Sequence, residues 1–208
     1  MQALKCVCIR LGSKFSGLNF SGDSPYKING ESIKFVSSHS DLGFTIDREM
    51  KFHEHIAETA RICNGIGSNI LQCTLDRGKD FMINIFISHI RPKLEYGCQL
   101  WNMGYVGDLK LVERVQRRWT KCIAGLESLS YAQRLSSLNL YSMQGRLLRA
   151  DSILLWKICN NMCAIKPENI FEMANSNVTR GHQFKIFVPR ARLEIRLRFF
   201  SVRIINYE

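Results

Sequence analysis

The sequence has no hydrophobic run long enough to cross a membrane. Its longest apolar stretches, residues 81–90 and 153–158, are short and interrupted by polar residues, whereas a membrane-spanning helix needs about 20 consecutive apolar residues. The first residues also lack the continuous apolar segment and the small-residue cleavage pattern of a secretory signal. We therefore expect an intracellular protein, nuclear or cytoplasmic, without a membrane partner.

Cysteine motifs that bind metal are also lacking, although the chain has eight cysteines. The close pairs are Cys6-x-Cys8 and Cys159-x3-Cys163, and neither is accompanied by a second Cys or His pair at zinc-ligand spacing. In a reducing compartment such cysteines behave as small buried hydrophobic residues. The cysteine pattern therefore favours core packing over a zinc site.

The motifs of several common enzyme classes are missing as well. The sequence has no Gly-x-Ser-x-Gly nucleophile elbow, no glycine-rich phosphate-binding loop and no Asp-Asp pair. His53-x-His55 is a poor metal site, because side chains two positions apart on a helix diverge and no third ligand is indicated. We expect no metal ion and no other cofactor in this chain.

What the sequence has in excess is positive charge. Of its 208 residues, 46% are hydrophobic and 23% charged, as in an ordinary folded protein, but the formal net charge is +11. An excess of this size favours a polyanionic partner, which is either a nucleic acid or an anionic membrane surface.

The first fifty residues are predicted to be rich in β-structure. Residues 4–11 form a short apolar run, and residues 26–35 contain Asn29-Gly30 between two β-prone segments. Asn-Gly favours a type I′ turn, because both of its residues tolerate positive φ, so we predict a hairpin here. Residues 41–47 read as one further short strand. This part is too small to bury a core alone.

Helical periodicity dominates from residue 52 onward. Apolar residues recur at steps of three and four positions at Phe52, Ile56, Ala60, Cys63, Ile66 and Ile70. Further helices are predicted over residues 79–90, where Arg91-Pro92 ends the helix, and over residues 109–124, 131–138 and 142–161. In the tail, residues 184–188 read as a strand, residues 193–198 alternate with a period of two, and residues 199–205 fit strand or helix equally.

The order of several sequence blocks carries further information. In chain order the blocks are Leu4-Lys5-Cys6-Val7-Cys8-Ile9, Tyr26-Lys27-Ile28-Asn29-Gly30, Asp41-Leu42-Gly43-Phe44-Thr45-Ile46-Asp47, Phe52-His53-Glu54-His55-Ile56, Ile90-Arg91-Pro92-Lys93-Leu94-Glu95-Tyr96 with Trp101-Asn102, Leu111-Val112-Glu113-Arg114-Val115-Gln116-Arg117-Arg118-Trp119-Thr120-Lys121, Tyr131-Ala132-Gln133-Arg134-Leu135, Thr179-Arg180-Gly181-His182 and Arg198-Phe199-Phe200-Ser201-Val202-Arg203. Together they resemble the region that follows the polymerase active site in reverse transcriptases of Jockey-like and chicken-repeat-like non-LTR retrotransposons.

This resemblance implies an α+β fold that is mainly α. Residues 1–50 would be the end of the palm with a primer-grip-like hairpin, and residues 51–126 would be thumb-like helices. Residues 127–208 would form a post-thumb helical region and a short basic β/α tail. The chain would then be a helical bundle that follows a small N-terminal β-hairpin region.

The resemblance also implies a polymerase that uses Mg²⁺ held by paired aspartates, because carboxylates hold the metal ions that activate the attacking hydroxyl. The family takes two of these aspartates from a Tyr/Phe-x-Asp-Asp turn, which this sequence lacks. The chain would begin just downstream of that turn. We therefore expect a truncated RNA-directed DNA polymerase without enzymatic activity of its own.

Nucleic-acid binding is expected at two places. By resemblance, Leu42 and Gly43 would lie against the primer strand. The helix over residues 109–124 carries Arg114, Arg117, Arg118 and Lys121 outside its apolar stripe, near the aromatic residues Trp101, Tyr105 and Trp119. Further cations lie at Arg134, Arg146 and Arg149, and a second, basic group is formed by the tail residues Arg190, Arg192, Arg196, Arg198 and Arg203.

The expected partners are RNA and DNA, bound with little sequence preference, and the missing polymerase portion is a further candidate partner. Two other readings remain open at this point. The apolar helical stripes would also suit a small protein-interaction domain. Alternatively, the chain would be a non-functional retroelement fragment whose palm strands, separated from their sheet, have exposed edges.

If the helix over residues 109–124 contacts phosphates, replacing both Arg117 and Arg118 with Ala should weaken binding most at low salt. Removing two phosphate contacts should flatten the slope of log affinity against log salt by about two units. Filter binding to an RNA–DNA hybrid across salt concentrations measures this slope. An unchanged slope would remove these two arginines from the interface.

Overall fold

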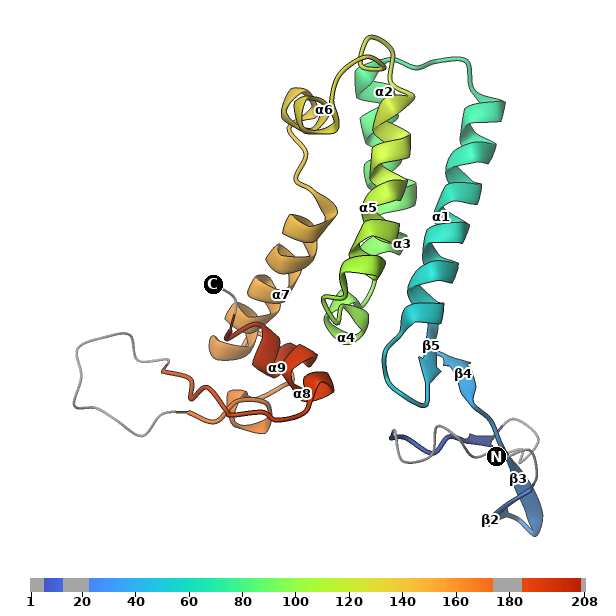
Figure 1. Ribbon diagram of the computed structural model, residues 1–208, viewed down its shortest axis with the longest axis vertical. Coiled ribbons are helices and arrows are strands. Elements are labelled where there is room, and N and C mark those ends of the chain that lie inside the picture. Colours follow the sequence, from blue (N-terminus) through green and yellow to red (C-terminus); the bar gives the residue numbers. More distant parts are fainter. Residues whose placement is uncertain (1–5, 13–22, 174–184, 207–208) are drawn as a thin grey trace. The chain divides into compact units, whose positions relative to one another are not determined.

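Small β-sheets at the N-terminal end are followed by helices, as Figure 1 shows. The computed structural model describes residues 6–12, 23–173 and 185–206. The chain divides into two units, Met1–Ile56 and Ala57–Glu208. The expected α+β class, mainly α, is confirmed. The three-part division at residues 50 and 126 stays a prediction.

The first unit contains a three-stranded sheet and a separate hairpin. Its strands are β1 (Val7–Cys8), β2 (Asp23–Ile28), β3 (Glu31–Phe35), β4 (Ser38–Asp41) and β5 (Phe44–Asp47). The sheet order is β1-β3-β2, with β1 parallel and β2 antiparallel to β3. The turn between β2 and β3 confirms the predicted hairpin, because Asn29 and Gly30 have φ values of 52° and 84°.

The single strand expected over residues 41–47 is wrong. The chain reverses at Leu42-Gly43, so that β4 and β5 pair as an antiparallel hairpin with Asp41 opposite Phe44. Leu42 and Gly43 adopt φ values of 49° and 86°. The sequence reading missed this turn because leucine disfavours the left-handed region, in which its Cβ crowds the backbone.

Asp47 fixes the connection from β5 to the first helix. Its carboxylate accepts hydrogen bonds from the backbone N–H groups of Glu49 at 2.8 Å, Lys51 at 3.2 Å and Phe52 at 2.7 Å. These donors precede the helix and would otherwise lack partners within it. The predicted start of helical structure after Phe52 is confirmed, since α1 spans His53–Cys73.

The remaining elements are helical. They are α2 (Lys79–Ile85), the π-helical segment η3 (Phe86–Ile90), α3 (Arg91–Glu95), α4 (Cys98–Trp101), α5 (Val106–Lys121), α6 (Tyr131–Leu138), α7 (Met143–Cys159), the 3-10 turn η4 (Pro167–Asn169), α8 (Glu194–Arg198) and α9 (Phe200–Arg203). The observed bounds of α5, α6 and α7 are close to the predicted helices over residues 109–124, 131–138 and 142–161. Helix α5 contacts both α6 and α7, and α4 contacts α7.

The prediction that a helix ends at Arg91-Pro92 is wrong. The chain stays helical from α2 through η3 into α3, and the N–H of Arg91 bonds to the carbonyl of Phe86, five residues earlier. Pro92 then occupies a position near the start of α3, where its missing N–H is tolerated. The wider π turn absorbs the proline that would otherwise break the helix.

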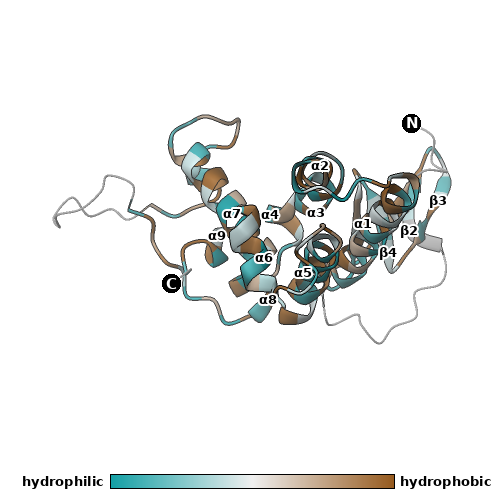
Figure 2. Cartoon of the chain, turned by 90° about the horizontal axis from the view of Figure 1, so that it is seen from above, coloured by the Kyte–Doolittle hydropathy of each residue, from teal (hydrophilic) through white to brown (hydrophobic). Residues whose placement is uncertain are grey.

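The core of the second unit is built along α5. Val112, Val115, Trp119 and Ile123 are buried, and the indole N–H of Trp119 donates to the carbonyl of Met82 at 3.0 Å. A side chain at Gly67 would begin 3.3 Å from the Trp119 ring, so glycine permits the close approach. Figure 2 shows that these helices carry hydrophobic and hydrophilic residues around their circumference, as amphipathic packing requires.

The tail is helical where the alternation of residues 193–198 indicated a strand. In α8, Glu194 pairs with Arg198 four residues later at 2.7 Å, a spacing that places side chains next to each other on a helix. In the following segment Phe200 and Ile204 are buried with Ile158. Of the strand expected over residues 184–188, residue 184 lies outside the described residues, and Ile186 makes an isolated bridge to Met173.

A buried ion pair joins the tail to α7. The Arg203 guanidinium donates to the Asp151 carboxylate at 2.9 and 3.2 Å, and it also donates to the backbone carbonyls of Asn102 and Arg198. Burial raises the pKa of the Asp151 carboxyl, and Arg203 acts in the opposite direction. The pair is therefore costly to break, because either partner alone would be an uncompensated buried charge.

Replacing Asp151 with Ala should destabilise the protein by about 3–5 kcal/mol, because Arg203 is left buried without its counter-ion. The control is Arg61→Ala, which breaks an exposed pair with Glu58 and should cost much less, because solvent screens exposed pairs. Urea unfolding followed by circular dichroism measures both. Equal losses would contradict a dominant role for the buried pair.

Candidate nucleic-acid interface

The cations predicted on the helix over residues 109–124 lie together on one face of α5. Arg114, Arg117, Arg118 and Lys121 follow the spacing that places side chains on one side of a helix, and all four are exposed. Lys110, one turn earlier, extends this face. We call these five residues the α5 cationic face. None of them forms an ion pair with a residue in the described part of the chain.

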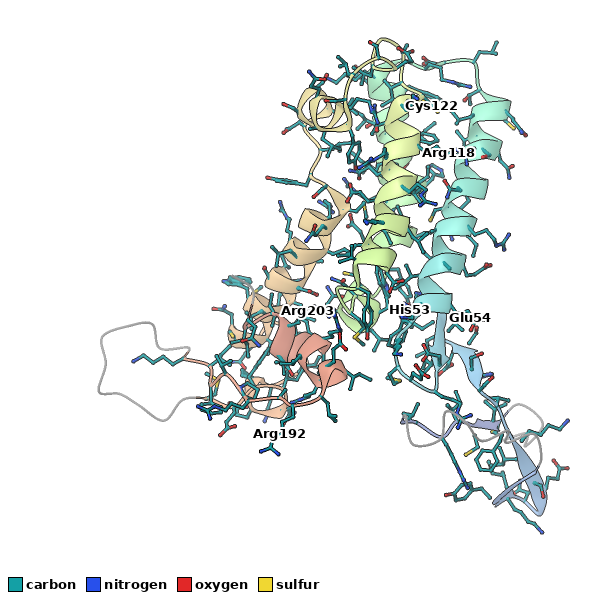
Figure 3. The ribbon with its side chains drawn as sticks, in the orientation of Figure 1. His53, Glu54, Arg118, Cys122, Arg192 and Arg203 are labelled. Atoms are coloured by element: carbon teal, nitrogen blue, oxygen red, sulfur yellow. The ribbon has the colours of Figure 1, made fainter. Side chains whose placement is uncertain are left out.

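Contacts within the protein position two of these cations. The Arg117 guanidinium lies 4.6 Å from the centre of the Tyr131 ring. Arg118 points towards α1, as Figure 3 shows, and donates to the Ser68 hydroxyl at 3.3 Å. Arg114 and Lys121 have no such contact with a described residue. The face thus combines two positioned guanidinium groups with three cations, Lys110, Arg114 and Lys121, that are exposed to solvent and can reach a ligand.

A second, polar side of α5 holds the following helices. Glu113 accepts hydrogen bonds from the Tyr131 hydroxyl and from the backbone N–H of Met143 at 3.0 Å, at the start of α7. Gln116 donates to the Tyr131 hydroxyl at 3.0 Å and to the Tyr141 carbonyl at 2.9 Å. Burial and the Glu113 carboxylate both raise the pKa of Tyr131. These contacts orient α5 so that its cations face outward.

Arg134 is not part of the exposed interface, contrary to the sequence-based expectation. Its side chain is 5% exposed, and it donates to the Thr120 hydroxyl at 3.2 Å, the Leu129 carbonyl at 2.6 Å and the Arg117 carbonyl at 3.3 Å. A guanidinium engaged in this way has a structural role at the end of α5, and a phosphate cannot reach it.

The nearby aromatic residues are not exposed stacking surfaces. Trp101 and Trp119 are buried, and the Trp101 indole N–H donates to the Tyr96 carbonyl at 2.8 Å. Trp119 belongs to the core of the second unit. The guanidinium of Arg198 lies over the Tyr105 ring, with 4.1 Å between the guanidinium carbon and the ring centre. The α5 cationic face therefore offers charge without base stacking by these three rings.

The tail cations separate into two groups. Arg203 is buried with Asp151, and Arg198 is held by Glu194 and the Met103 carbonyl. Arg190 and Arg192 are exposed, and in Figure 3 Arg192 points away from the helices. The tail therefore does not act as one basic surface, and Arg203 in particular is not available to a ligand.

Leu42 and Gly43 lie at the tip of the β4–β5 hairpin, in the first unit. Leu42 is 79% exposed, and the hairpin contains no lysine or arginine. A strand of nucleic acid at this tip would meet backbone and an apolar side chain rather than a cation. The primer-strand contact implied by resemblance at Leu42 and Gly43 stays a prediction.

The two histidines of His53-x-His55 point apart. His55 is buried and accepts a hydrogen bond from the Thr45 N–H at its Nδ1 atom, at 3.4 Å, and burial lowers its pKa. His53 is exposed (Figure 3). The described residues contain no group of three His, Cys, Asp or Glu side chains arranged to hold a metal ion. Nor does any helix formed by those residues combine the length and apolar character that a membrane crossing requires.

Comparisons with protein-family models, with curated proteins and with solved structures find no match. The resemblance to reverse transcriptases therefore stays a prediction, and a functional proposal depends on the charges and contacts described above.

One exposed residue was not recognised from the sequence. Trp156 is 56% exposed on α7, and it was not singled out from the sequence. The available signal was its spacing of seven residues, about two helical turns, from Arg149. That spacing places an aromatic ring and a cation on one side of the helix.

Replacing Arg134 with Ala should lower the free energy of unfolding by about 2–3 kcal/mol, because three hydrogen bonds from a buried charged donor are lost. The salt dependence of nucleic-acid binding should stay unchanged under conditions where the variant is folded. Urea unfolding and filter binding test the two statements. If the variant is normally stable but has a flatter slope of log affinity against log salt, Arg134 does contact the nucleic acid.

Proposed function

We propose that this chain is a nucleic-acid-binding part of a non-LTR retrotransposon reverse transcriptase, and that it binds RNA and DNA without polymerising them. The observation that carries the proposal is the α5 cationic face, whose exposed cations have no carboxylate partner among the described residues. Unpaired exposed cations on one face are suited to phosphates, because each contact releases condensed counterions from the nucleic acid.

The arrangement supports backbone recognition rather than sequence reading. From Lys110 to Lys121 the cations extend for about 17 Å along α5, at 1.5 Å per residue. Such a row follows a phosphate backbone, and phosphate contacts fix position without distinguishing bases. The ligand that suits the proposal best is an RNA–DNA hybrid, whose A-like geometry is recognised through its shape and its phosphates.

Catalysis is not part of the proposal. Polymerase chemistry by two metal ions requires clustered carboxylates, and the sequence contains no Asp-Asp pair. In the second unit, the Asp151 carboxylate is buried and paired with Arg203, so it is not available to a metal ion. Asp108 is buried at the start of α5. This chain would contribute binding, with the missing polymerase portion as its partner in the nucleus or cytoplasm.

The decisive variant removes Arg114 and Lys121 together, because neither side chain forms a hydrogen bond or an ion pair within residues 6–12, 23–173 and 185–206. Arg114→Ala with Lys121→Ala should flatten the slope of log affinity for an RNA–DNA hybrid against log salt by about two units. Binding should weaken to the same extent for hybrids of different sequence. Fluorescence anisotropy with two labelled hybrids at several salt concentrations measures both.

The matched control removes two exposed cations elsewhere in the second unit, by Lys93→Ala with Lys166→Ala. It lowers the net charge equally and should alter the slope by much less than the α5 variant. Equal effects of the two variants would show that only the overall charge matters. No binding of the unmodified chain at low salt would contradict nucleic-acid binding and would favour a protein-interaction domain.

A further inference from the structure

A groove between α7 and the α3–α4 segment is lined by cations and is separate from the α5 cationic face. It encloses about 300 Å³, and its lining includes Glu95, Arg146, Arg149, Ile153 and Lys157. We call it the α7 groove. Its floor combines the partly exposed Ile153 with the aliphatic stems of the long side chains.

The charge of the α7 groove is strongly positive. Its only carboxylate among the lining residues is Glu95, which accepts two hydrogen bonds at 2.7 Å from Arg146 and lies 3.8 Å from Arg91. One carboxylate thus lies between two guanidinium groups. Arg149 and Lys157 have no ion-pair partner in the described part of the chain. The unbalanced charge favours an anionic ligand.

Trp156 lies beside this groove and presents its ring to solvent. It follows Arg149 by seven residues, which places both side chains on the same side of α7. Its side chain is 56% exposed, whereas Trp101 and Trp119 are 2% and 4% exposed. An exposed tryptophan next to unpaired cations is the combination that holds single strands, because bases stack on the ring while phosphates contact the cations.

We propose that the α7 groove binds an unpaired segment of nucleic acid, with a base stacked on Trp156 and phosphates held by Arg149 and Lys157. Those two cations are about 12 Å apart along the helix axis, so they contact different phosphates. A concave, cation-lined groove fits a flexible strand better than a flat anionic membrane. This site goes beyond the hybrid binding proposed for α5, and neither proposal requires the other.

The test uses the full chain and a short oligothymidylate, which forms no duplex. Adding the oligothymidylate should quench tryptophan emission, because a base stacks on the Trp156 ring. The change can be assigned to Trp156, since the other two tryptophans are buried. Trp156→Ala should remove the quenching and weaken binding by about ten-fold, as the loss of one stacked base implies. Tyr141→Ala, which removes an aromatic side chain that is 63% exposed outside the groove, should leave both unchanged.

A second variant tests the charges without altering the ring. Arg149→Ala with Lys157→Ala should flatten the salt slope for oligothymidylate by about 1.4 units, at roughly 0.7 per single-strand phosphate contact. Both residues are exposed and form no ion pair with any described residue, so the variant should keep the unfolding curve of the unmodified chain. The Arg114→Ala with Lys121→Ala variant should still show the Trp156 quenching, even if hybrid binding fails.

Two results would overturn this site. The first is quenching and affinity that survive Trp156→Ala unchanged. The second is a Trp156 emission that responds to vesicles containing phosphatidylserine but not to oligothymidylate, which would assign the same surface to an anionic membrane. Because hybrid binding is measured separately on the α5 variants, failure here leaves the function proposed for α5 standing.

Discussion

Hydrogen bonds along one side of α5 hold this helix to the two that follow it. Glu113 receives the N–H of Met143 at the start of α7 and the hydroxyl of Tyr131 on α6, while Thr120 receives the guanidinium of Arg134. The apolar side of α5 is buried at the same time. With two sides fully engaged, the cationic side of α5 is the one left for solvent and for a ligand.

The same blocks of sequence therefore have two physical roles. Within residues 111–121, the glutamate, glutamine and threonine join helices, whereas the arginines and the lysine remain outside. A similar division holds for the tail, where Arg203 neutralises Asp151 inside the protein and Arg192 stays exposed. The net charge of +11 already counts Arg203 and Asp151 as cancelling, but it also includes Arg134, whose charge is buried among neutral carbonyls and a hydroxyl and does not meet a ligand.

Elements with a strong local signal were predictable. The Asn29-Gly30 turn follows from the tolerance of both residues for positive φ. Helices α5, α6 and α7 follow from their apolar spacing, and in the structure the hydroxyls of Ser130 and Ser142 cap α6 and α7. Prediction failed where contacts between residues far apart in the sequence determine the backbone conformation. Leu42 takes a left-handed turn that its side chain disfavours, Pro92 lies inside a continuous helical segment, and residues 193–198 become helical beside Tyr105.

The sequence by itself determined the helical composition, the amphipathic spacing and the row of cations on α5, because these depend on residues a few positions apart. Only the tertiary structure decided which cations remain available. Arg134 and Arg114 are chemically identical, yet the first is surrounded by backbone carbonyls and a hydroxyl, and the second faces solvent. Trp156 differs from Trp119 in the same way, since burial is set by which helices pack together and not by the residue alone.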